Sequence, residues 1–368
     1  MKKRNLKIKN VDIILLSYIF IMISDMFSNV DFLKPFLSLF SYFGIFIISI
    51  EILIQSKNYK KGSFLIILFL LIITGFFTIK NLFTDNYKNI VYILLFIIAS
   101  KNLDFDYIVK KVFKYRLIFM MCIIICSFLN LTTDFNMLRI NSNTIRYSLG
   151  FAHPNRLSAC IMELVFEYIY IYKNKLSYFK IFNLILISYL VIYVTDSRTV
   201  SIMIIITLLF LLLNKFLKGK LIEKSFVNNM IRFLPILMCL LSVYICYLFN
   251  NGNTMAYNLN TLLTGRIRLM SNAIKISGIT LFGSNVDAVD NSYIQLITRT
   301  GIIFSSIFIV LYIKSLKHVI NEKNYTLCII FMLYLFFGLF ESYLFRLTYN
   351  VFILYFGKMI YCTRKKRE

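Results

Sequence analysis

Ser63-Phe-Leu-Ile-Ile-Leu-Phe-Leu-Leu-Ile-Ile-Thr-Gly-Phe-Phe-Thr-Ile79 carries no charged side chain along its whole length. Similar apolar runs occupy Phe233–Phe249 and Tyr293–Ile313. A helix of about 20 residues crosses the roughly 30 Å hydrocarbon core of a bilayer, and it closes its own backbone hydrogen bonds there. These runs therefore predict an all-α fold, namely a polytopic transmembrane helical bundle.

The composition indicates the same class of protein. Apolar residues make up 59% of the 368 residues, and the mean hydropathy is +0.75. A soluble domain of this length carries fewer apolar residues in shorter runs. Because the sequence shows no repeat and no soluble domain, we expect a single integral membrane domain over residues 1–368.

The apolar runs predict about twelve spans. The expected bounds are Val11–Val30, Pro35–Ile54, Ser63–Ile79, Asn89–Ser100, Leu117–Leu131, Leu157–Tyr172, Ile181–Thr195, Val200–Leu213, Phe233–Phe249, Tyr293–Ile313, Thr326–Leu339 and Phe345–Tyr361. The basic start Met1–Arg4 followed by the first span also fits a signal peptide. No small-residue cleavage site follows that span, so we expect an uncleaved helix.

Basic residues divide unevenly between the two sides of this topology. With a cytoplasmic amino terminus, 28 of the 41 basic residues fall inside and 12 outside, with Lys358 within the last span. Cytoplasmic loops of membrane proteins carry such an excess. The pattern predicts that both termini are cytoplasmic, and orientation at an anionic inner leaflet explains the net charge of +24 without nucleic acid.

The amino-acid usage indicates the kind of organism and the state of the cysteines. Heavy use of Ile, Lys and Asn is typical of a bacterium with an AT-rich genome, which predicts a bacterial plasma membrane. The seven cysteines fall in predicted spans or in the inner tail. Neither a disulfide nor a metal cluster is therefore expected.

The cations predicted outside are mostly arginine, whereas those inside are mostly lysine. Orientation does not explain this difference, because either residue satisfies the positive-inside bias. A planar guanidinium suits phosphate and carboxylate oxygens, so outer arginines indicate an anion site. The alternative is that they are anchored at lipid headgroups. The outer arginines are Arg139, Arg146, Arg156, Arg198, Arg266, Arg268, Arg299 and Arg346.

The first long outer loop is Thr132–Arg156, and it ends in Arg146-Tyr-Ser-Leu-Gly-Phe-Ala-His153-Pro-Asn155. Pro154 restricts His153 to extended geometry, and Asn155 is the expected cap of the next helix. A helix amino terminus beside arginines predicts a phosphate seat. The alternative is an ordinary Asn cap next to a surface histidine.

The second long outer loop is Asn250–Ser292. Apolar residues recur at helical spacing from Leu259 to Ile274, which predicts an amphipathic segment along the outer membrane face. The far end, Gly283-Ser-Asn-Val-Asp-Ala-Val-Asp290-Asn-Ser-Tyr293, supplies carboxylates and amides that can bond sugar hydroxyls. The alternative is an amphipathic lid with no chemistry.

Charged residues also lie at the predicted outer ends of spans. Asp196-Ser-Arg198-Thr and Glu341-Ser-Tyr-Leu-Phe-Arg346 are turns there, and Arg299 lies within a span. Intramembrane charges are costly unless they face a partner or a wet cavity, so we expect these residues to line one funnel.

Two further charges lie in the apolar helix predicted at Leu157–Tyr172. Glu163 and Glu167 are four residues apart and share one face. We expect them to pair with Arg299, and a purely structural ion pair is the alternative reading.

Four motifs together resemble a known family. In chain order they are Arg146-Tyr-Ser-Leu-Gly-Phe-Ala-His-Pro-Asn155, Asp196-Ser-Arg-Thr199, Thr264-Gly-Arg-Ile-Arg268 and Asp290-Asn-Ser-Tyr293. On this topology they resemble the Wzy-type polysaccharide polymerases of Gram-positive capsule and exopolysaccharide loci, in the O-antigen ligase-like superfamily. The resemblance runs roughly from Leu117 to Tyr361. Arg139 to Gly150 fits the Arg-x10-Gly pattern that some O-antigen members carry in both outer loops, whereas Arg266 to Gly278 is one residue longer.

The resemblance implies a metal-independent glycosyltransferase without a cofactor. It would polymerise undecaprenyl-pyrophosphate-linked repeat units on the outer face of the cell membrane. Those units and membrane lipids are the implied partners. A flippase and a chain-length regulator of a capsule-assembly system are further candidates, although no binding motif identifies them, and no nucleic acid is expected.

The expected chemistry is direct glycosyl transfer, in which a sugar hydroxyl attacks the anomeric carbon of a second unit and expels lipid pyrophosphate. His153 is the first candidate for the general base because an unperturbed imidazole has a pKa of about 6.5, and Asp290 is the second. The arginines expected to hold the departing pyrophosphate are Arg146, Arg198, Arg266 and Arg268. The remaining candidates for substrate binding are Arg139, Asn155, Arg156, Asp196, Asn291, Tyr293, Arg299, Glu341 and Arg346.

Three other functions are compatible with the sequence. A ligase of the same superfamily would transfer finished polymer to another acceptor, and the loops do not separate it from a polymerase. A lipid-linked oligosaccharide flippase would need basic residues along a cavity that reaches both faces. A structural scaffold for capsule assembly is the third alternative.

Overall fold

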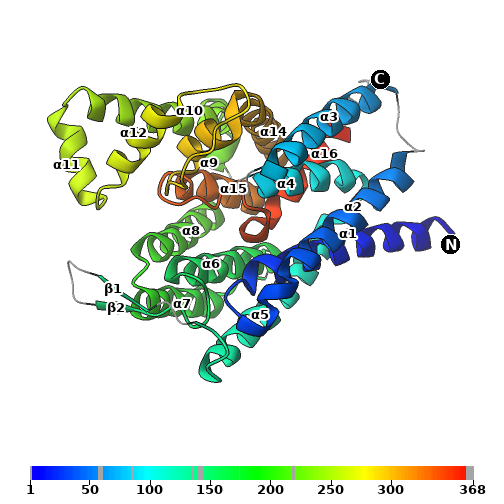
Figure 1. The fold of residues 1–368 in the computed structure, drawn as a ribbon, viewed down its shortest axis with the longest axis horizontal. Coiled ribbons are helices and arrows are strands. Elements are labelled where there is room, and N and C mark those ends of the chain that lie inside the picture. The colour runs from blue at the N-terminus through cyan, green and yellow to red at the C-terminus, as the bar shows by residue number, and fades with distance from the viewer. Residues whose placement is uncertain are drawn as a thin grey trace. The chain divides into compact units, whose positions relative to one another are not determined.

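The computed structural model describes residues 2–56, 61–83, 87–133, 136–139, 144–173, 175–217 and 220–361. The prediction of an all-helical chain is confirmed, since the described residues form helices with one two-stranded hairpin (Figure 1). Some of the basic residues predicted inside and one cysteine of the inner tail lie outside the described residues, namely Lys57, Lys60, Lys218, Cys362, Arg364, Lys365, Lys366 and Arg367.

The backbone groups into two compact units. Unit 1 comprises Met1–Leu71, Leu94–Leu209 and Leu347–Glu368, and unit 2 comprises Ile72–Ile93 and Phe210–Arg346. Each unit therefore combines segments that are distant in the sequence. The single domain over residues 1–368 stays a prediction.

The helices and strands follow the chain in this order. The first half contains α1 (Lys2–Met26), η1 (Asp31–Phe36), α2 (Leu37–Ser56), α3 (Lys61–Phe83), α4 (Lys88–Ala99), η3 (Ser100–Asn102), α5 (Phe105–Phe128), β1 (Met137–Arg139), β2 (Thr144–Arg146), α6 (Pro154–Ile171) and α7 (Tyr178–Thr195). The second half contains α8 (Arg198–Phe216), α9 (Lys220–Glu223), α10 (Ser225–Asn250), α11 (Thr254–Leu262), α12 (Arg266–Ser277), α13 (Ser292–Gln295), η4 (Leu296–Thr300), α14 (Gly301–Asn321), α15 (Tyr325–Phe337), η5 (Leu347–Tyr349), η6 (Val351–Tyr355) and α16 (Phe356–Tyr361).

Several of these elements have the length and composition of membrane spans. Within the described residues, five are long and apolar enough to cross a membrane, and they are Asp31–Ser56, Tyr178–Thr195, Arg198–Phe216, Ser225–Asn250 and Ser292–Asn321. Shorter apolar helices are Phe64–Lys80, Lys88–Ala99, Tyr325–Phe337 and Val351–Tyr361. Large apolar side chains such as Leu65, Tyr189 and Leu240 are exposed along these helices, as expected of surfaces that face lipid. The number of crossings and the two outer loops stay predictions.

Helix α5 (Phe105–Phe128) begins well before the predicted span Leu117–Leu131, whose membrane bounds stay a prediction. The helix starts at Phe105 because the Asp104 carboxylate accepts a hydrogen bond from the backbone N–H of Tyr107, at 3.1 Å, and caps the helix. The longer helix places Arg116 near its middle, where the side chain is fully buried.

The last predicted span, Phe345–Tyr361, is not one helix. The chain passes through turns up to Arg346, then through the 3-10 helices η5 and η6, and only α16 is α-helical. Asn350 separates η5 from η6 with φ −153° and ψ 79°. The backbone groups left open by this break are bonded by side chains of α5 and α6, as described below.

The span that begins at Ser292 is also discontinuous. It passes from α13 through the π-helix η4 and restarts at Gly301, which has φ +80°. Residues 278–291, which connect α12 to α13 and are called the strap below, bond to the backbone at the break between η4 and α14. Ser284 N–H donates to the Thr298 carbonyl at 2.8 Å, and Ile302 N–H donates to the Thr280 carbonyl at 3.0 Å. Non-helical backbone is tolerated in such a span where protein groups satisfy it.

The core of unit 1 is aromatic. The ring centroid of Phe105 on α5 lies 5.5 Å from that of Tyr170 on α6. It also lies 6.1 Å from the ring centroid of Phe352 and 5.3 Å from that of Tyr355, both on η6. Aromatic pairs at these distances add to the hydrophobic burial of each ring. The carboxyl-terminal segment is thus held directly against α5 and α6.

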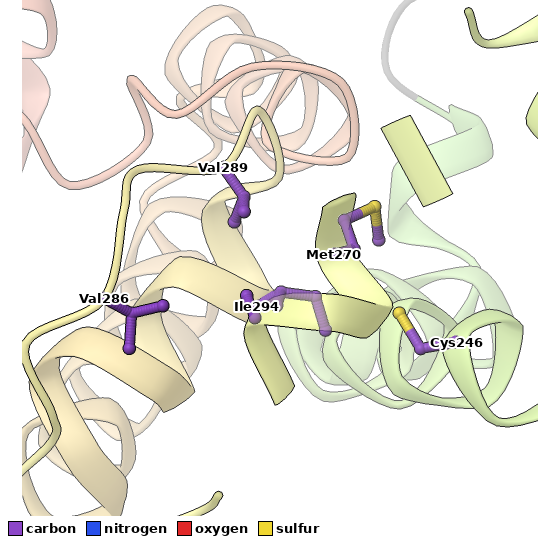
Figure 2. Close-up of a cluster of buried hydrophobic side chains, with 6 residues drawn as sticks. Cys246, Met270, Val286, Val289 and Ile294 are labelled. Atoms are coloured by element: carbon purple, nitrogen blue, oxygen red, sulfur yellow. The ribbon is translucent and has the colours of Figure 1, made fainter. Parts of the chain in front are cut away.

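Unit 2 has a core around α12. Figure 2 shows Met270 of α12, Cys246 of α10 and Ile294 of α13 converging with the two valines of the preceding strap, Val286 and Val289. The amphipathic segment expected from Leu259 to Ile274 is not one continuous helix, because the left-handed residues Thr264 and Gly265 divide it into α11 and α12. Its position along the outer membrane face stays a prediction. The apolar side of α12 faces protein.

Candidate functional site

The arginine-containing loop of unit 1 is organised by the β1–β2 hairpin, which lies beside α7 in Figure 1. Met137 pairs with Arg146 in the antiparallel register, and Tyr147 N–H donates to the Val194 carbonyl at 2.9 Å. The guanidinium of Arg146 donates from Nε to the Thr195 carbonyl at 2.9 Å and from Nη2 to Asn155 Oδ1 at 2.5 Å. Arg146 therefore connects the hairpin, the end of α7 and the start of α6.

The cap of α6 is His153, so the expected Asn155 cap is wrong. Pro154 occupies the first helical position and holds His153 extended, with φ −164° and ψ 144°. His153 Nδ1 then accepts the backbone N–H of Asn155 at 3.0 Å. The side chain of Asn155 is left to accept from Arg146.

This cap limits the acid–base chemistry of His153. An Nδ1 lone pair that accepts a backbone N–H carries no proton, so the neutral imidazole has its proton on Nε2. Nε2 is then a donor and is poorly suited to take a proton from a sugar hydroxyl. The role of His153 as general base stays a prediction, and the geometry favours Asp290 over it.

The turn between α7 and α8 presents Arg198. Asp196 ends α7 in the left-handed conformation, with φ 47°, and its Oδ2 accepts from Thr144 Oγ1 at 3.3 Å. The Nε of Arg198 lies 3.6 Å from Asp196 Oδ1, and 63% of the Arg198 side chain is exposed. Arg198 is therefore much more available to an outside anion than Arg146.

Two other predicted residues of this loop have separate positions. Arg156 donates from Nη1 to Ser28 Oγ at 3.1 Å and lies 3.9 Å from the Asp25 carboxylate, so it ties α6 to the end of α1. Arg139 ends β1, and its side chain lies outside the part of the structure that is described. The described partners of Arg156 differ from those of Arg146.

An apolar groove runs beside this loop in unit 1. It has a volume of about 470 Å³ and is lined by α5, α6 and α7, with Leu149 of the loop and Val194 at one end and Lys180 and Tyr168 toward the other. The amine of Lys180 is bonded to the Lys175 carbonyl at 3.1 Å. Because Val194 directly precedes the Thr195 carbonyl that holds Arg146, the groove leads to the polar loop.

The predicted residues of unit 2 gather around Arg266. Its Nη2 lies 3.3 Å from Glu341 Oε1, its Nε lies 3.5 Å from Asp290 Oδ2, and its Nη1 also donates to the Phe340 carbonyl. Only 4% of the Glu341 side chain is exposed, against 46% for Asp290. Two carboxylates largely neutralise Arg266, and Asp290 is the one that outside groups can reach.

The residues next to Asp290 hold the start of α13. Asn291 caps this helix by accepting from Ile294 N–H at 2.9 Å, and its amide donates to the Leu339 carbonyl at 2.9 Å. The Tyr293 hydroxyl donates to the Leu335 carbonyl at 2.7 Å. Asn291 and Tyr293 are buried and bonded to backbone, so they position Asp290 better than they could bind a sugar.

The remaining arginines of unit 2 differ in their surroundings. Arg268 is exposed on α12, and its guanidinium has no ion pair within the part of the chain that the structure describes. Arg299 lies in η4 and interacts electrostatically with Arg346 and Asp287. Arg346 lies over the Tyr343 ring, 5.4 Å from its centroid. Arg268 is thus the more available of the two arginines in the Thr264–Arg268 motif.

The expected pairing of Glu163 and Glu167 with Arg299 is wrong, because both contact Arg116. The Nε of Arg116 lies 3.1 Å from Glu167 Oε1, and its Nη2 lies 3.5 Å from Glu163 Oε1. The sequence did not indicate this role, because Arg116 directly precedes the predicted span Leu117–Leu131 and is one of the basic residues predicted inside. Two glutamates on one face of an apolar helix need a buried cation as partner, and this need could have indicated the role of Arg116 from the sequence.

The described sites combine exposed arginines, an accessible carboxylate and an apolar groove. No protein-family model, curated protein or solved structure matches this chain. Arg198 and Arg268 can bind anions, Asp290 can accept a proton, and the groove can bind a long apolar chain.

Proposed function

We propose that this chain is a membrane glycosyltransferase that joins undecaprenyl-pyrophosphate-linked repeat units into a polysaccharide. The observation that carries the proposal is the apolar groove that leads to the arginine-containing loop of unit 1. A ligand that fits both features has a long hydrocarbon tail and an anionic head. A lipid-linked pyrophosphate has this chemistry.

The groove has the dimensions for a long tail. Its lining along α7 extends from Lys180 to Val194, which corresponds to roughly 20 Å of helix. Apart from Lys180 and Asn183, the side chains that line it are apolar or aromatic. Such a surface gains free energy from burying a hydrocarbon chain and holds its head near Arg146 and Arg198.

In the proposed reaction the hydroxyl oxygen of an acceptor sugar forms a bond to the anomeric carbon of a donor unit. The bond from that carbon to the pyrophosphate oxygen breaks, and the lipid pyrophosphate leaves with the electron pair. The hydroxyl proton passes to a base. Asp290 is our candidate for the base, because it is the exposed carboxylate that Arg266 orients.

The arginines have different proposed roles. Arg198 of unit 1 and Arg268 of unit 2 are each available, and each would bind a pyrophosphate group of the lipid-linked units. Arg146 and Arg266 are tied to protein acceptors, so they would position the loop and the carboxylate. We also propose that both termini are cytoplasmic and that the loops face the outside of a bacterial cell membrane, since the distribution of basic residues supports that orientation.

Substitution of the available arginines tests the reaction. In a deletion strain complemented with Arg198→Ala or Arg268→Ala, we expect polymer yield to fall about 100-fold, because each arginine would be a charge-stabilising donor. The measurement is the size distribution of lipid-linked and surface glycan. Lys275→Ala, an exposed cation at the end of α12, is the matched control and should leave the ladder unchanged.

The same measurement distinguishes the alternatives. Single lipid-linked repeats that accumulate without a ladder support a polymerase. Long lipid-linked chains that do not reach an acceptor would indicate a ligase, and repeats trapped on the inner face would indicate a flippase. Full-length polymer from both arginine variants would overturn the proposed roles.

A second test concerns the groove. Ile187→Trp would fill its middle, whereas Leu186→Trp adds the same side chain to an exposed face of α7 outside the groove. We expect the first substitution to reduce polymer yield at least about tenfold, because a tail that cannot enter loses its apolar contacts. Equal yields from the two variants at equal protein levels would show that the groove does not bind substrate.

A further inference from the structure

A fully buried ionic cluster lies at the centre of unit 1. Arg116 of α5 donates from Nε to both carboxylate oxygens of Glu167 on α6, at 3.1 and 3.2 Å. Its Nη2 lies 3.5 Å from Glu163 Oε1, and the side chains of all three residues are 0% exposed. The described partners of this cluster do not include Arg146, Arg198, Arg266 or Arg268. The inference below therefore does not depend on the proposed reaction.

The charges of this cluster do not balance. Two ionised glutamates and one arginine would leave one net negative charge without solvent. The cost of an uncompensated buried ion is several kcal/mol even after relaxation, so a neutral cluster is strongly favoured. One additional positive charge is therefore needed among these side chains.

The contacts identify where that charge belongs. Glu167 accepts two hydrogen bonds from Arg116, which suits an ionised carboxylate. Glu163 accepts only the Val351 N–H at Oε1, at 2.8 Å, and its buried Oε2 has no hydrogen-bond partner in the described structure. We propose that the cluster is a proton-binding site, with one proton held on Glu163 while Glu167 and Arg116 form the ion pair.

Other titratable groups close to Glu163 and Glu167 do not supply the missing charge. Tyr18 of α1 and Cys160 of α6 interact electrostatically with both glutamates and with Arg116. Both are neutral or negative in every protonation state. The Tyr18 hydroxyl is moreover engaged as a donor to the Leu347 carbonyl at 2.7 Å.

The bound proton would control the carboxyl-terminal segment of unit 1. Arg116 Nη1 donates to the Thr348 carbonyl at 2.5 Å, and Glu163 accepts from Val351 N–H. These are backbone groups of the break between η5 and η6. Loss of the proton would add a buried negative charge beside Val351, so raising the pH would weaken the attachment of this segment to α5 and α6.

Infrared difference spectroscopy of the full chain in detergent at neutral pH tests the assignment. A protonated carboxylic acid has a carbonyl band that an ionised carboxylate lacks. We expect the band to be reduced in Glu163→Gln relative to the unsubstituted chain and retained in Glu167→Gln. Glu51→Gln is a necessary control, because Glu51 is also buried and can contribute a similar band.

Stability against pH provides a second readout that does not depend on the spectrum. The unfolding temperature of the unsubstituted chain, measured by helical circular dichroism, should be lower at alkaline pH than at neutral pH. Glu163→Gln keeps the acceptor for Val351 N–H and cannot lose a proton, so this alkaline shift should be reduced at least by half. Glu167→Gln should instead lower the unfolding temperature at both pH values.

Three results would overturn the proposal. An unchanged band in Glu163→Gln would mean that the cluster is fully ionised, and loss of the band only in Glu167→Gln would place the proton on the other glutamate. Failure of Glu163→Gln to fold would show that the ionised form of Glu163 is required.

Discussion

Arg116→Leu is expected to destabilise unit 1 more than any other single charge removal. The substitution leaves Glu163 and Glu167 buried without a cation, and it removes the donor to the Thr348 carbonyl. Removing one partner of a buried ion pair costs roughly 3–5 kcal/mol. We expect little or no monodisperse protein after purification in detergent, and the measurement is size-exclusion chromatography with helical circular dichroism.

Lys114→Leu is the matched control for this prediction. It replaces a cation by leucine two residues away on α5, at an exposed position, and should leave the folded yield unchanged. The double variant Arg116→Leu with Glu167→Gln removes both members of the ion pair and should recover part of the yield. If Arg116→Leu behaved like Lys114→Leu, the cluster would not contribute to stability.

Gly283→Ala is expected to have the second large effect, in unit 2. Gly283 has φ +74°, and an added Cβ would overlap the carbonyl group of Arg299 and lie 2.8 Å from the Thr300 nitrogen. The contacting atoms are backbone, so they cannot move aside as a side chain would. The strap around Gly283 also receives Lys80, whose Nζ donates to the Phe282 and Gly283 carbonyls at 2.8 and 2.7 Å.

The expected result is loss of the strap from the break between η4 and α14. We would measure the unfolding temperature by circular dichroism, since the chain has no tryptophan for fluorescence. Gly252→Ala and Gly278→Ala are the controls, because both glycines have positive φ but nothing lies within 4 Å of an added Cβ. They bear only the backbone strain of a positive φ, which costs about 1–3 kcal/mol. An equal effect of all three substitutions would show that strain alone decides the loss.

Part of the candidate site was predictable from local sequence. Asp290 and Arg266 lie in different segments of one predicted loop, and both proved to be neighbours in unit 2. The neutralisation of Arg266 was not predictable, because Glu341 is 75 positions away in the sequence and reaches Arg266 only after folding. Likewise, local pattern identified the start of α6 but not which side chain caps it.

The sequence by itself determined the helical class and the location of most apolar helices. The apolar run Phe233–Phe249 lies within α10, as predicted. A helix closes its own backbone hydrogen bonds, so such a run is stable whether its side chains contact lipid or protein. The same reasoning failed for Phe345–Tyr361, which is also mostly apolar although it includes Arg346, Asn350 and Lys358. There Arg116 bonds Thr348 and Glu163 bonds Val351, across separations of 232 and 188 positions. Only the tertiary structure could decide this break, because the groups that compensate its lost helical hydrogen bonds come from α5 and α6.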